Sequence, residues 1–159
     1  MTRQIHLLLG VHNHQPVDNW EGVMRHAYQK CYQPFLDVLE RHPGIKFSVH
    51  NTGYLLDWLA EHHRDWVERL SGLAERGQVE LITGGFYEPI LAIIPEADKI
   101  GQIRKLSDRI HELNGQTPHG LWLAERVWEP HLVKPLVQAG VQYVFLDDSH
   151  FRAVGLEDD

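Results

Sequence analysis

Five short apolar runs alternate with longer amphipathic stretches, and this alternation constrains the fold more than any other feature of the chain. The runs predict strands over Ile5–Val11, Ile45–His50, Val79–Thr83, Gly120–Ala124 and Gln142–Asp147. The intervening stretches predict helices over Trp20–Arg41, split near Pro34, and over Leu55–Arg76, Glu96–Leu113 and Pro130–Ala139, the last capped by Gly140. Strands and helices in this order form right-handed βαβ units around a parallel sheet.

Two α/β architectures fit this order, an open doubly wound sheet and part of a (β/α) barrel. The chain has 159 residues, which suits one domain, whereas a complete eight-stranded barrel usually needs about 250. We therefore expect a barrel of this kind to be incomplete. The final residues, Gly155–Asp159, are not expected to form a helix over the fifth strand.

Charge and cysteine content exclude several classes of function. The chain carries 15 Lys and Arg against 22 Asp and Glu, a net charge of −7, which argues against partners such as nucleic acid or an anionic membrane. The single cysteine, Cys31, excludes an intrachain disulfide and a cysteine-rich metal site. Ile5–Val11 is too short for a transmembrane helix, and no signal-peptide cleavage pattern follows it, so we expect a cytoplasmic protein.

Reactive polar side chains follow every predicted strand. Parallel α/β folds place their active sites beyond the carboxyl ends of the strands. These ends carry His12-Asn13-His14, His50-Asn51, Tyr87-Glu88, Glu125-Arg126 and Asp147-Asp148. The sequence therefore predicts a shared catalytic or binding rim.

His12 and His14 lie on one face of an extended segment because side chains alternate along a strand. Such a pair can bind zinc or iron in a hydrolase, with the remaining ligands drawn from His50, Glu88, Asp148 or His150. The two imidazoles can equally donate hydrogen bonds to sugar hydroxyls, or simply satisfy a tight loop. Spacing alone leaves these alternatives open.

Glu125 is the strongest candidate for a catalytic carboxylate. It emerges from the apolar run Leu121–Ala124 beside Arg126, so we expect a partly buried, ionised group suited to covalent attack at an anomeric carbon. The alternative is an ordinary surface pair between Glu125 and Arg126. The nearby rings of Trp122 and Trp128 favour the catalytic interpretation, since flat apolar rings stack on sugar faces.

Glu80 interrupts the apolar strand Val79–Thr83, where a charge facing a dry core would be costly. If Glu80 faces a barrel interior, it can hold a ligand hydroxyl or His14. If it faces the helix layer, it needs a cation, and none is evident. A shift of one residue in register separates the two cases.

Three segments together resemble glycoside hydrolase family 57, a family of 4-α-glucanotransferases, α-amylases and related α-glucan enzymes. They are the segments His12–Pro16, Gly77–Pro89 and Trp122–Trp128, and the resemblance covers essentially the whole chain. The Glu-Arg-Val-Trp form of the third segment is more similar to the glucanotransferase and amylase branch than to the branching enzymes.

The resemblance implies an incomplete (β/α)7 barrel and retaining cleavage or transfer of α-1,4-glucans or malto-oligosaccharides. It implies that Glu125 is the nucleophile and that His12, His14, Glu80 and Trp122 line the sugar subsite. No metal or organic cofactor is implied.

One part of the family pattern is missing. The family takes its acid/base aspartate from a motif similar to His-Asp-Asp-Gly-Glu, and this chain has no such string. Asp147-Asp148-Ser149-His150-Phe151 lies only 22 residues after Glu125 and resembles the segment after the fifth strand instead. We therefore expect residues 1–159 to be the N-terminal part of the catalytic domain. A metal-dependent hydrolase or deacetylase built on His12 and His14, and an inert glucan-binding fragment, are the alternative hypotheses.

Overall fold

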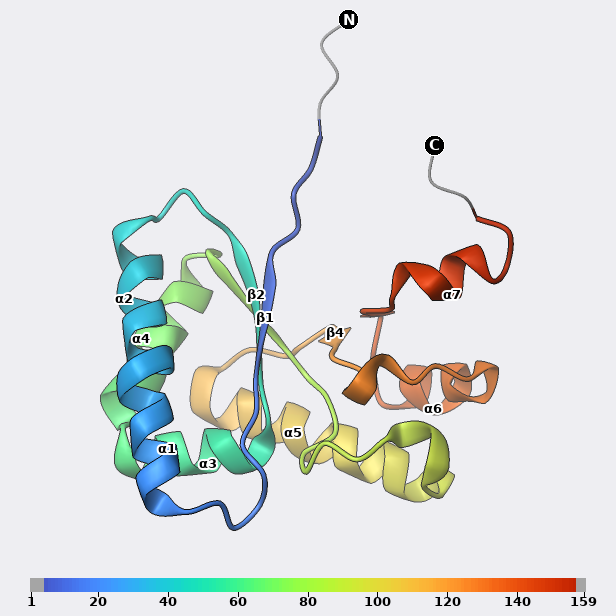
Figure 1. Ribbon diagram of the computed structural model, residues 1–159, viewed down its shortest axis with the longest axis horizontal. Helices are drawn as coiled ribbons and strands as arrows, with labels where there is room; N and C mark the ends of the chain where they lie inside the picture. Colours follow the sequence, from blue (N-terminus) through green and yellow to red (C-terminus); the bar gives the residue numbers. More distant parts are fainter. Residues whose placement is uncertain (1–4, 157–159) are drawn as a thin grey trace, which may run out of the picture.

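The computed structural model describes residues 5–156 of the chain (Figure 1). Within these residues there are five short strands, β1 Gly10–Asn13, β2 Phe47–Asn51, β3 Val79–Ile82, β4 Gly120–Leu121 and β5 Tyr143–Val144. The helices are α1 Glu21–Ala27, α2 Gln33–Arg41, α3 Gly53–His62, α4 Arg64–Glu75, α5 Glu96–Asn114, α6 Val133–Gln138 and α7 Asp148–Arg152. Short 3-10 turns occupy Leu91–Ile93, Ala124–Arg126 and Pro130–Leu132.

The strands are neighbours in chain order, and this order selects between the two predicted architectures. β1, β2 and β3 form one parallel sheet, and β4 and β5 form a second. A parallel bridge between Thr83 and Leu121 joins the two groups. An open doubly wound sheet reverses its strand order at a switch point, whereas consecutive neighbours are the order of a (β/α) barrel.

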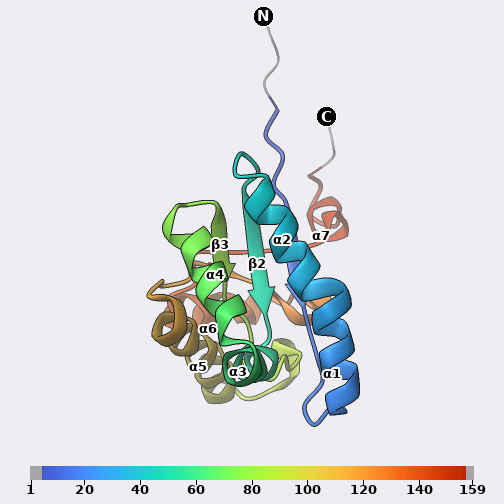
Figure 2. The same ribbon diagram turned by 90° about the vertical axis from the view of Figure 1, so that its left-hand side faces the viewer.

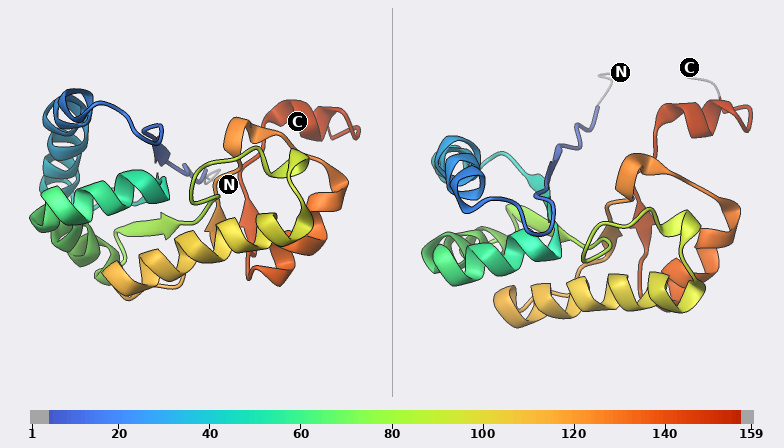
Figure 3. Two further views of the ribbon diagram at one scale, coloured as in Figure 1. Left: turned by 90° about the horizontal axis from the view of Figure 1, so that it is seen from below. Right: turned by 60° about the horizontal axis from the view of Figure 1, so that its bottom comes forward.

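The helices follow the strands as an arc. Seen from below, α1 and α2, α3 and α4, α5 and α6 succeed one another along the outside, and the arc stays open between β1 and α7 (Figure 3). The same layering is visible from the side, where α2 and α4 lie in front of β2 (Figure 2). The chain therefore has the curvature of a barrel wall with its helices on the convex side.

Strand register divides side chains between the two faces of this wall. Val11 and Val49 are paired in register, and Leu81 is the partner of Val49 on β3. These residues pack into the first hydrophobic core, under the helices. Since side chains alternate along a strand, His12 and His50 face the opposite, concave side. A second core lies farther along the chain, under α5 and α6, and consists of Leu91, Ile103, Leu121, Leu123, Leu132 and Leu136.

The first predicted strand was placed too early. β1 begins at Gly10, and Ile5, Leu7 and Leu8 are 90%, 78% and 89% exposed. Backbone pairing starts where the Leu9 carbonyl accepts a hydrogen bond from Ser48 N at 2.9 Å. Ile5–Leu8 extends past the start of β2, and no strand within residues 5–156 lies opposite it. Its apolar composition therefore did not produce a buried strand. The fourth and fifth strands are likewise shorter than predicted.

The first predicted helix is divided into two α-helices, as expected, with Pro34 in the first turn of the second. A π-helical segment, Tyr28–Tyr32, joins α1 to α2. It lies just before Pro34, which has no backbone N–H to continue the regular α-helical hydrogen bonds. Trp66 on α4 donates its indole N–H to the Tyr32 carbonyl at 3.1 Å. A buried side chain thus satisfies a carbonyl beside the irregular turn.

The second predicted helix is two helices. His63 leaves helical geometry with φ −142° and ψ 54°, ending α3 and preceding α4. Its ring stacks on Tyr28 of the π segment with a centroid separation of 3.5 Å. Apolar spacing alone did not predict this break, because both helices keep the same periodic pattern.

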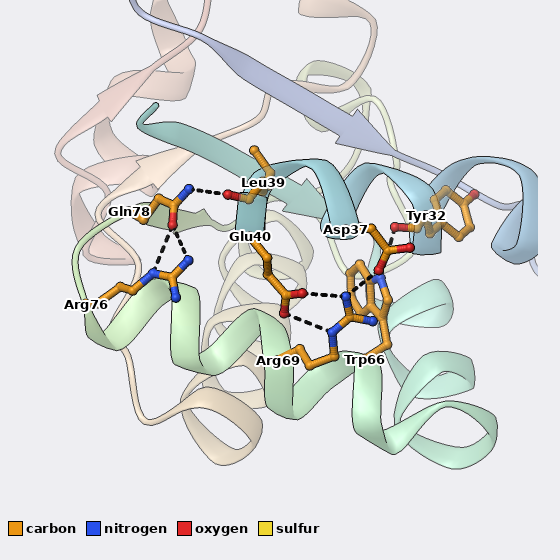
Figure 4. A network of polar contacts seen from close by, with 8 residues as sticks. All are labelled: Tyr32, Asp37, Leu39, Glu40, Trp66, Arg69, Arg76 and Gln78. Carbon is orange, nitrogen blue, oxygen red and sulfur yellow. Dashed lines mark hydrogen bonds and ion pairs between the residues drawn. The ribbon is translucent and has the colours of Figure 1, made fainter. Parts of the chain in front are cut away.

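Polar contacts fasten α4 to α2 across the helix layer (Figure 4). The Arg69 guanidinium binds Asp37 at 2.5 Å and Glu40 at 2.7 Å. At the other end of α4, the buried Gln78 side chain donates to the Leu39 carbonyl at 2.7 Å and accepts from Arg76. These contacts fix the helices that back β1 and β2.

Helix α7, Asp148–Arg152, follows β5 in a stretch for which no element was predicted. Gly155 and Leu156 are not helical, as expected, and the rest of the predicted segment Gly155–Asp159 lies outside the described residues. No helix within residues 5–156 has the length and hydropathy of a membrane span.

Gly53 provides a test of the packing between α3 and the loop after β3. A Cβ at this position would overlap the ring of Phe86, which is only 3% exposed, and Gly53 N also donates to the Phe86 carbonyl at 2.8 Å. We expect Gly53→Ala to lower the free energy of unfolding by about 1–3 kcal/mol, measured by urea denaturation.

Gly72→Ala is the matched control, because no atom lies within 4 Å of its added Cβ on the exposed side of α4. This change should raise stability by about 0.5–1 kcal/mol. Equal stability of Gly53→Ala and the wild type would contradict the packing described here.

Candidate active site

Aromatic rings from three strands meet on the concave side of the wall. The ring of His12, on β1, stacks on Trp122, just after β4, with centroids 4.5 Å apart and planes 10° apart. The ring of His50, on β2, also stacks on the ring of His12, with centroids 4.9 Å apart. The strand register produces this arrangement, since His12 and His50 are direct partners in the parallel ladder.

The carboxylate of Glu88 joins the two histidines of the first strand end. One oxygen lies 2.9 Å from His12 Nε2, and the other contacts His14 Nδ1. Glu88 lies in the loop after β3, where its backbone adopts a left-handed φ of 54° and its N–H bonds to the Gly85 carbonyl at 2.9 Å. A left-handed conformation is uncommon for a residue with a Cβ and often marks a functional site.

His50 is the buried support of this group. It is fully buried, and its Nδ1 lies 2.7 Å from His12 Nδ1, so one ring donates to the other. Desolvation lowers the pKa of His50 well below its usual value, and the nearby His12 and His14 act in the same direction. His50 is therefore neutral at pH 7, and its Nε2 has no hydrogen-bond partner within the described residues.

Glu125 is exposed rather than partly buried, contrary to the sequence-based expectation. It lies in the 3-10 turn after β4 with φ 52°, and Arg126 follows with φ 53°. Arg126 does not pair with Glu125 but with Asp147 at the end of β5, at 2.7 Å. Within residues 5–156, the Glu125 carboxylate has no hydrogen-bond or ion-pair partner, which leaves it available to a ligand.

Glu80 faces the concave side, which settles the register question in favour of the barrel interior. Its carboxylate accepts from the Tyr143 hydroxyl on β5, and Ser48 Oγ lies 3.5 Å away. The Tyr143 pKa is raised by burial and by this carboxylate. Glu80 does not hold His14, the role left open by the sequence, because it is level with Ser48 and Gly10, four residues before His14.

The structure thus brings together three of the predicted site residues and adds a fourth and a fifth. His12, His14 and Trp122 share one cluster, to which Glu88 and His50 contribute. From the sequence, Glu88 and His50 were only candidate metal ligands. The strand-end pattern contains both, but nothing in it shows that Glu88 reaches back to β1. The other two candidate ligands make local contacts in α7 instead. Asp148 pairs with Arg152, and His150 Nδ1 contacts the Asp147 carbonyl.

Comparison with known proteins identifies the chain's family. The family model described as glycosyl hydrolase family 57 matches residues 8–158. The chain belongs to glycosyl hydrolase family 57. The resemblance seen in the three sequence segments is therefore confirmed, and this family 57 chain is an incomplete (β/α)7 barrel.

Its relatives carry two enzyme names. The family 57 chain is 52% identical to alpha-amylase 1 of Dictyoglomus thermophilum over 159 residues, which is 100% of this chain and 23% of the relative. It is 46% identical to the 4-alpha-glucanotransferase of Thermococcus litoralis over 153 residues, 96% of this chain and 23% of the relative. The crystal structure of the latter superposes with a TM-score of 0.90 over 94% of this chain and 23% of that one. The chain spans about a quarter of the length of these relatives.

The buried state of His50 predicts how stability depends on pH. Because the folded-state pKa lies below that of the unfolded chain, about 6.5, only the unfolded state takes up this proton as the pH falls below 6.5. The contribution is fully present above that value, and stability is lost below it by up to about 1.4 kcal/mol per pH unit. We expect His50→Asn to reduce this slope, measured by urea denaturation between pH 5 and 7.5 with a chelator present.

His26→Asn is the control, since His26 lies exposed on α1. An unchanged slope in His50→Asn, or an equal reduction in His26→Asn, would contradict the neutral buried state.

Proposed function

We propose that this chain is the N-terminal part of the catalytic domain of a retaining α-glucan enzyme, either a 4-α-glucanotransferase or an α-amylase. The observation that carries the proposal is the unpartnered Glu125 carboxylate, held on a left-handed turn three residues after the stacked Trp122. The names of the relatives agree with an α-glucan substrate, and both enzyme types begin with cleavage of the same α-1,4 linkage.

Glu125 is assigned as the nucleophile. Its carboxylate oxygen forms a bond to the anomeric carbon while the bond from that carbon to the glycosidic oxygen breaks, giving a β-glycosyl-enzyme. The leaving oxygen takes a proton from a general acid. Water or a sugar hydroxyl then attacks the same carbon, gives its proton to that group and releases Glu125, so the two inversions retain configuration.

We place the general acid/base outside residues 5–156. A retaining pair needs carboxyl groups about 5–5.5 Å apart, and the family's His-Asp-Asp-Gly-Glu type of motif is absent from the sequence. Without proton transfer to the leaving group, cleavage slows by about 10²–10⁴-fold. The choice between water and a sugar as acceptor belongs to that same remaining part of the enzyme.

The strained turn gives Glu125 a fixed position. Its backbone is closed by hydrogen bonds from Arg126 N to the Leu123 carbonyl at 2.9 Å and from Val127 N to the Ala124 carbonyl at 3.2 Å. Leu123 and Ala124 are buried, which anchors the turn in the second core. Two successive left-handed residues cost free energy, about 1–2 kcal/mol each, and the anchored turn maintains them. The turn thereby fixes the backbone of Glu125, and its carboxylate has no partner within residues 5–156 that a substrate would have to displace.

The cluster of His12, His14, Glu88 and Trp122 is proposed as the sugar subsite. His12 covers one face of the Trp122 indole, and the part of Trp122 that remains exposed offers an apolar surface to sugar C–H groups. His14 and Glu88 present polar atoms at the same place, with His14 44% exposed. Glu80 also faces the interior, two residues nearer the amino ends of the strands than the level of His12 and His50. It is proposed to contact the glucan there.

Glu125→Gln tests the nucleophile in an enzyme of full family length that carries this chain. We expect turnover of maltoheptaose to fall by at least about 10³-fold, with glucan affinity within about threefold of wild type, because the amide keeps the shape but does not attack carbon. Glu129→Gln, an exposed neighbour on the same loop, should retain activity. Turnover of Glu125→Gln near the wild-type rate would exclude this assignment.

Trp122→Ala tests the subsite in the 159-residue chain itself, by calorimetric titration with maltoheptaose. Loss of a stacked ring should weaken binding by about threefold to tenfold, and Trp122→Phe should recover part of it. Trp20→Ala is the control, since Trp20 is 81% exposed in the segment before α1. Equal affinities of wild type and Trp122→Ala would remove Trp122 from the subsite.

A further inference from the structure

We propose that His12, His14 and Glu88 form a zinc-binding site within the sugar subsite, and that Zn²⁺ bound there excludes the glucan. Zinc binding is independent of the proposed function. The exclusion of glucan rests on it.

The three side chains present a ligand set suited to zinc. One ligand atom from each, two imidazole nitrogens and a carboxylate oxygen, lie within 4.8 Å of one another. Two histidines and one glutamate, with a fourth position left for water, form a common zinc coordination. Ligands on a tetrahedral zinc are about 3.3 Å apart, close to the 2.9 Å between His12 Nε2 and Glu88. The half-exposed His14 ring can rotate to complete the set.

The backbone holds two of these ligands before any ion arrives. His12 is fixed by its pairing with His50 across β1 and β2. Glu88 is fixed by its left-handed turn and by the bond from its N–H to Gly85. Its side chain is only 11% exposed, so the carboxylate has little freedom to leave the two rings.

The ring nitrogen of His12 that would not bind zinc, Nδ1, already has a hydrogen-bond partner. Histidines that bind metals engage the other ring nitrogen with a second group, which fixes the tautomer and the ring orientation. His12 Nδ1 lies 2.7 Å from Nδ1 of the buried His50. His12 can therefore donate from Nδ1 to His50 while Nε2 offers its lone pair to the ion.

A bound ion would use the atoms that the glucan needs. Coordination engages the polar atoms of His12, His14 and Glu88, which are proposed to meet sugar hydroxyls beside Trp122. Zinc and glucan would then compete for one place, and the proposed enzyme would be inhibited reversibly by zinc.

Zinc binding is measured on the untagged 159-residue chain, by calorimetry and by competition with a fluorescent chelator. We expect one Zn²⁺ per chain, and at least about tenfold weaker binding in His14→Asn and Glu88→Gln. Co²⁺ bound to the wild type should show the visible absorption of a low-coordinate site, which a surface histidine does not give. Glu80→Gln is the control, since Glu80 faces the same side but bonds to Tyr143.

Thermal melting of each variant separates loss of the site from loss of the fold. His14 is the informative position, since its side chain is 44% exposed and its replacement should leave the fold intact. Absence of saturable binding by the wild type, or full affinity in folded His14→Asn, overturns the zinc site whatever the enzyme's activity.

Competition is measured in an enzyme of full family length that carries this chain. Zinc should raise KM for maltoheptaose without changing kcat, and a chelator should restore the initial KM. Zinc that binds without changing KM, or activity that requires zinc, overturns the exclusion. The zinc titrations on the isolated chain test the zinc site even if the enzyme has a different activity.

Discussion

The parallel register of β1 against β2 is the constraint on which the rest of the site depends. It sets His12 beside His50 and, in the row next to it, Val11 beside Val49. One row faces the helices and enters the core, while the other faces the concave side. A slip by one residue would exchange the rows, burying imidazoles under the helices and exposing valines to the site. The hydrophobic core thereby fixes the orientation of the polar cluster.

Several features were predictable because they depend on local pattern. The parallel strands, the long helix α5 and the shared edge for reactive side chains follow from apolar periodicity and strand order. His12 and His14 were placed at that edge correctly, and the family resemblance of the segments that carry them and Trp122 is confirmed. The roles of these residues stay predictions.

Other features depend on partners that a pattern does not contain. Ile5–Leu8 is mostly apolar but has no described strand opposite it, so it remains outside the sheet. Glu125 follows a buried strand but is itself exposed, in a turn whose backbone becomes left-handed, and Arg126 pairs with Asp147 and not with Glu125. Glu88 comes to His12 and His14 only through the fold of the loop after β3. Hydropathy and spacing describe neighbours along the chain, whereas each of these outcomes is set by neighbours in space.

The link between the two strand groups has a mechanical consequence. β3 and β4 meet at one bridge, between Thr83 and Leu121, and each side of this seam has its own hydrophobic core. His12 is carried by the first core and Trp122 by the second, yet their rings are stacked. Any rotation of one core relative to the other would shift the ring of His12 along the ring of Trp122. The relative position of the His12 and Trp122 rings therefore depends on how rigidly the Thr83–Leu121 bridge joins the two cores.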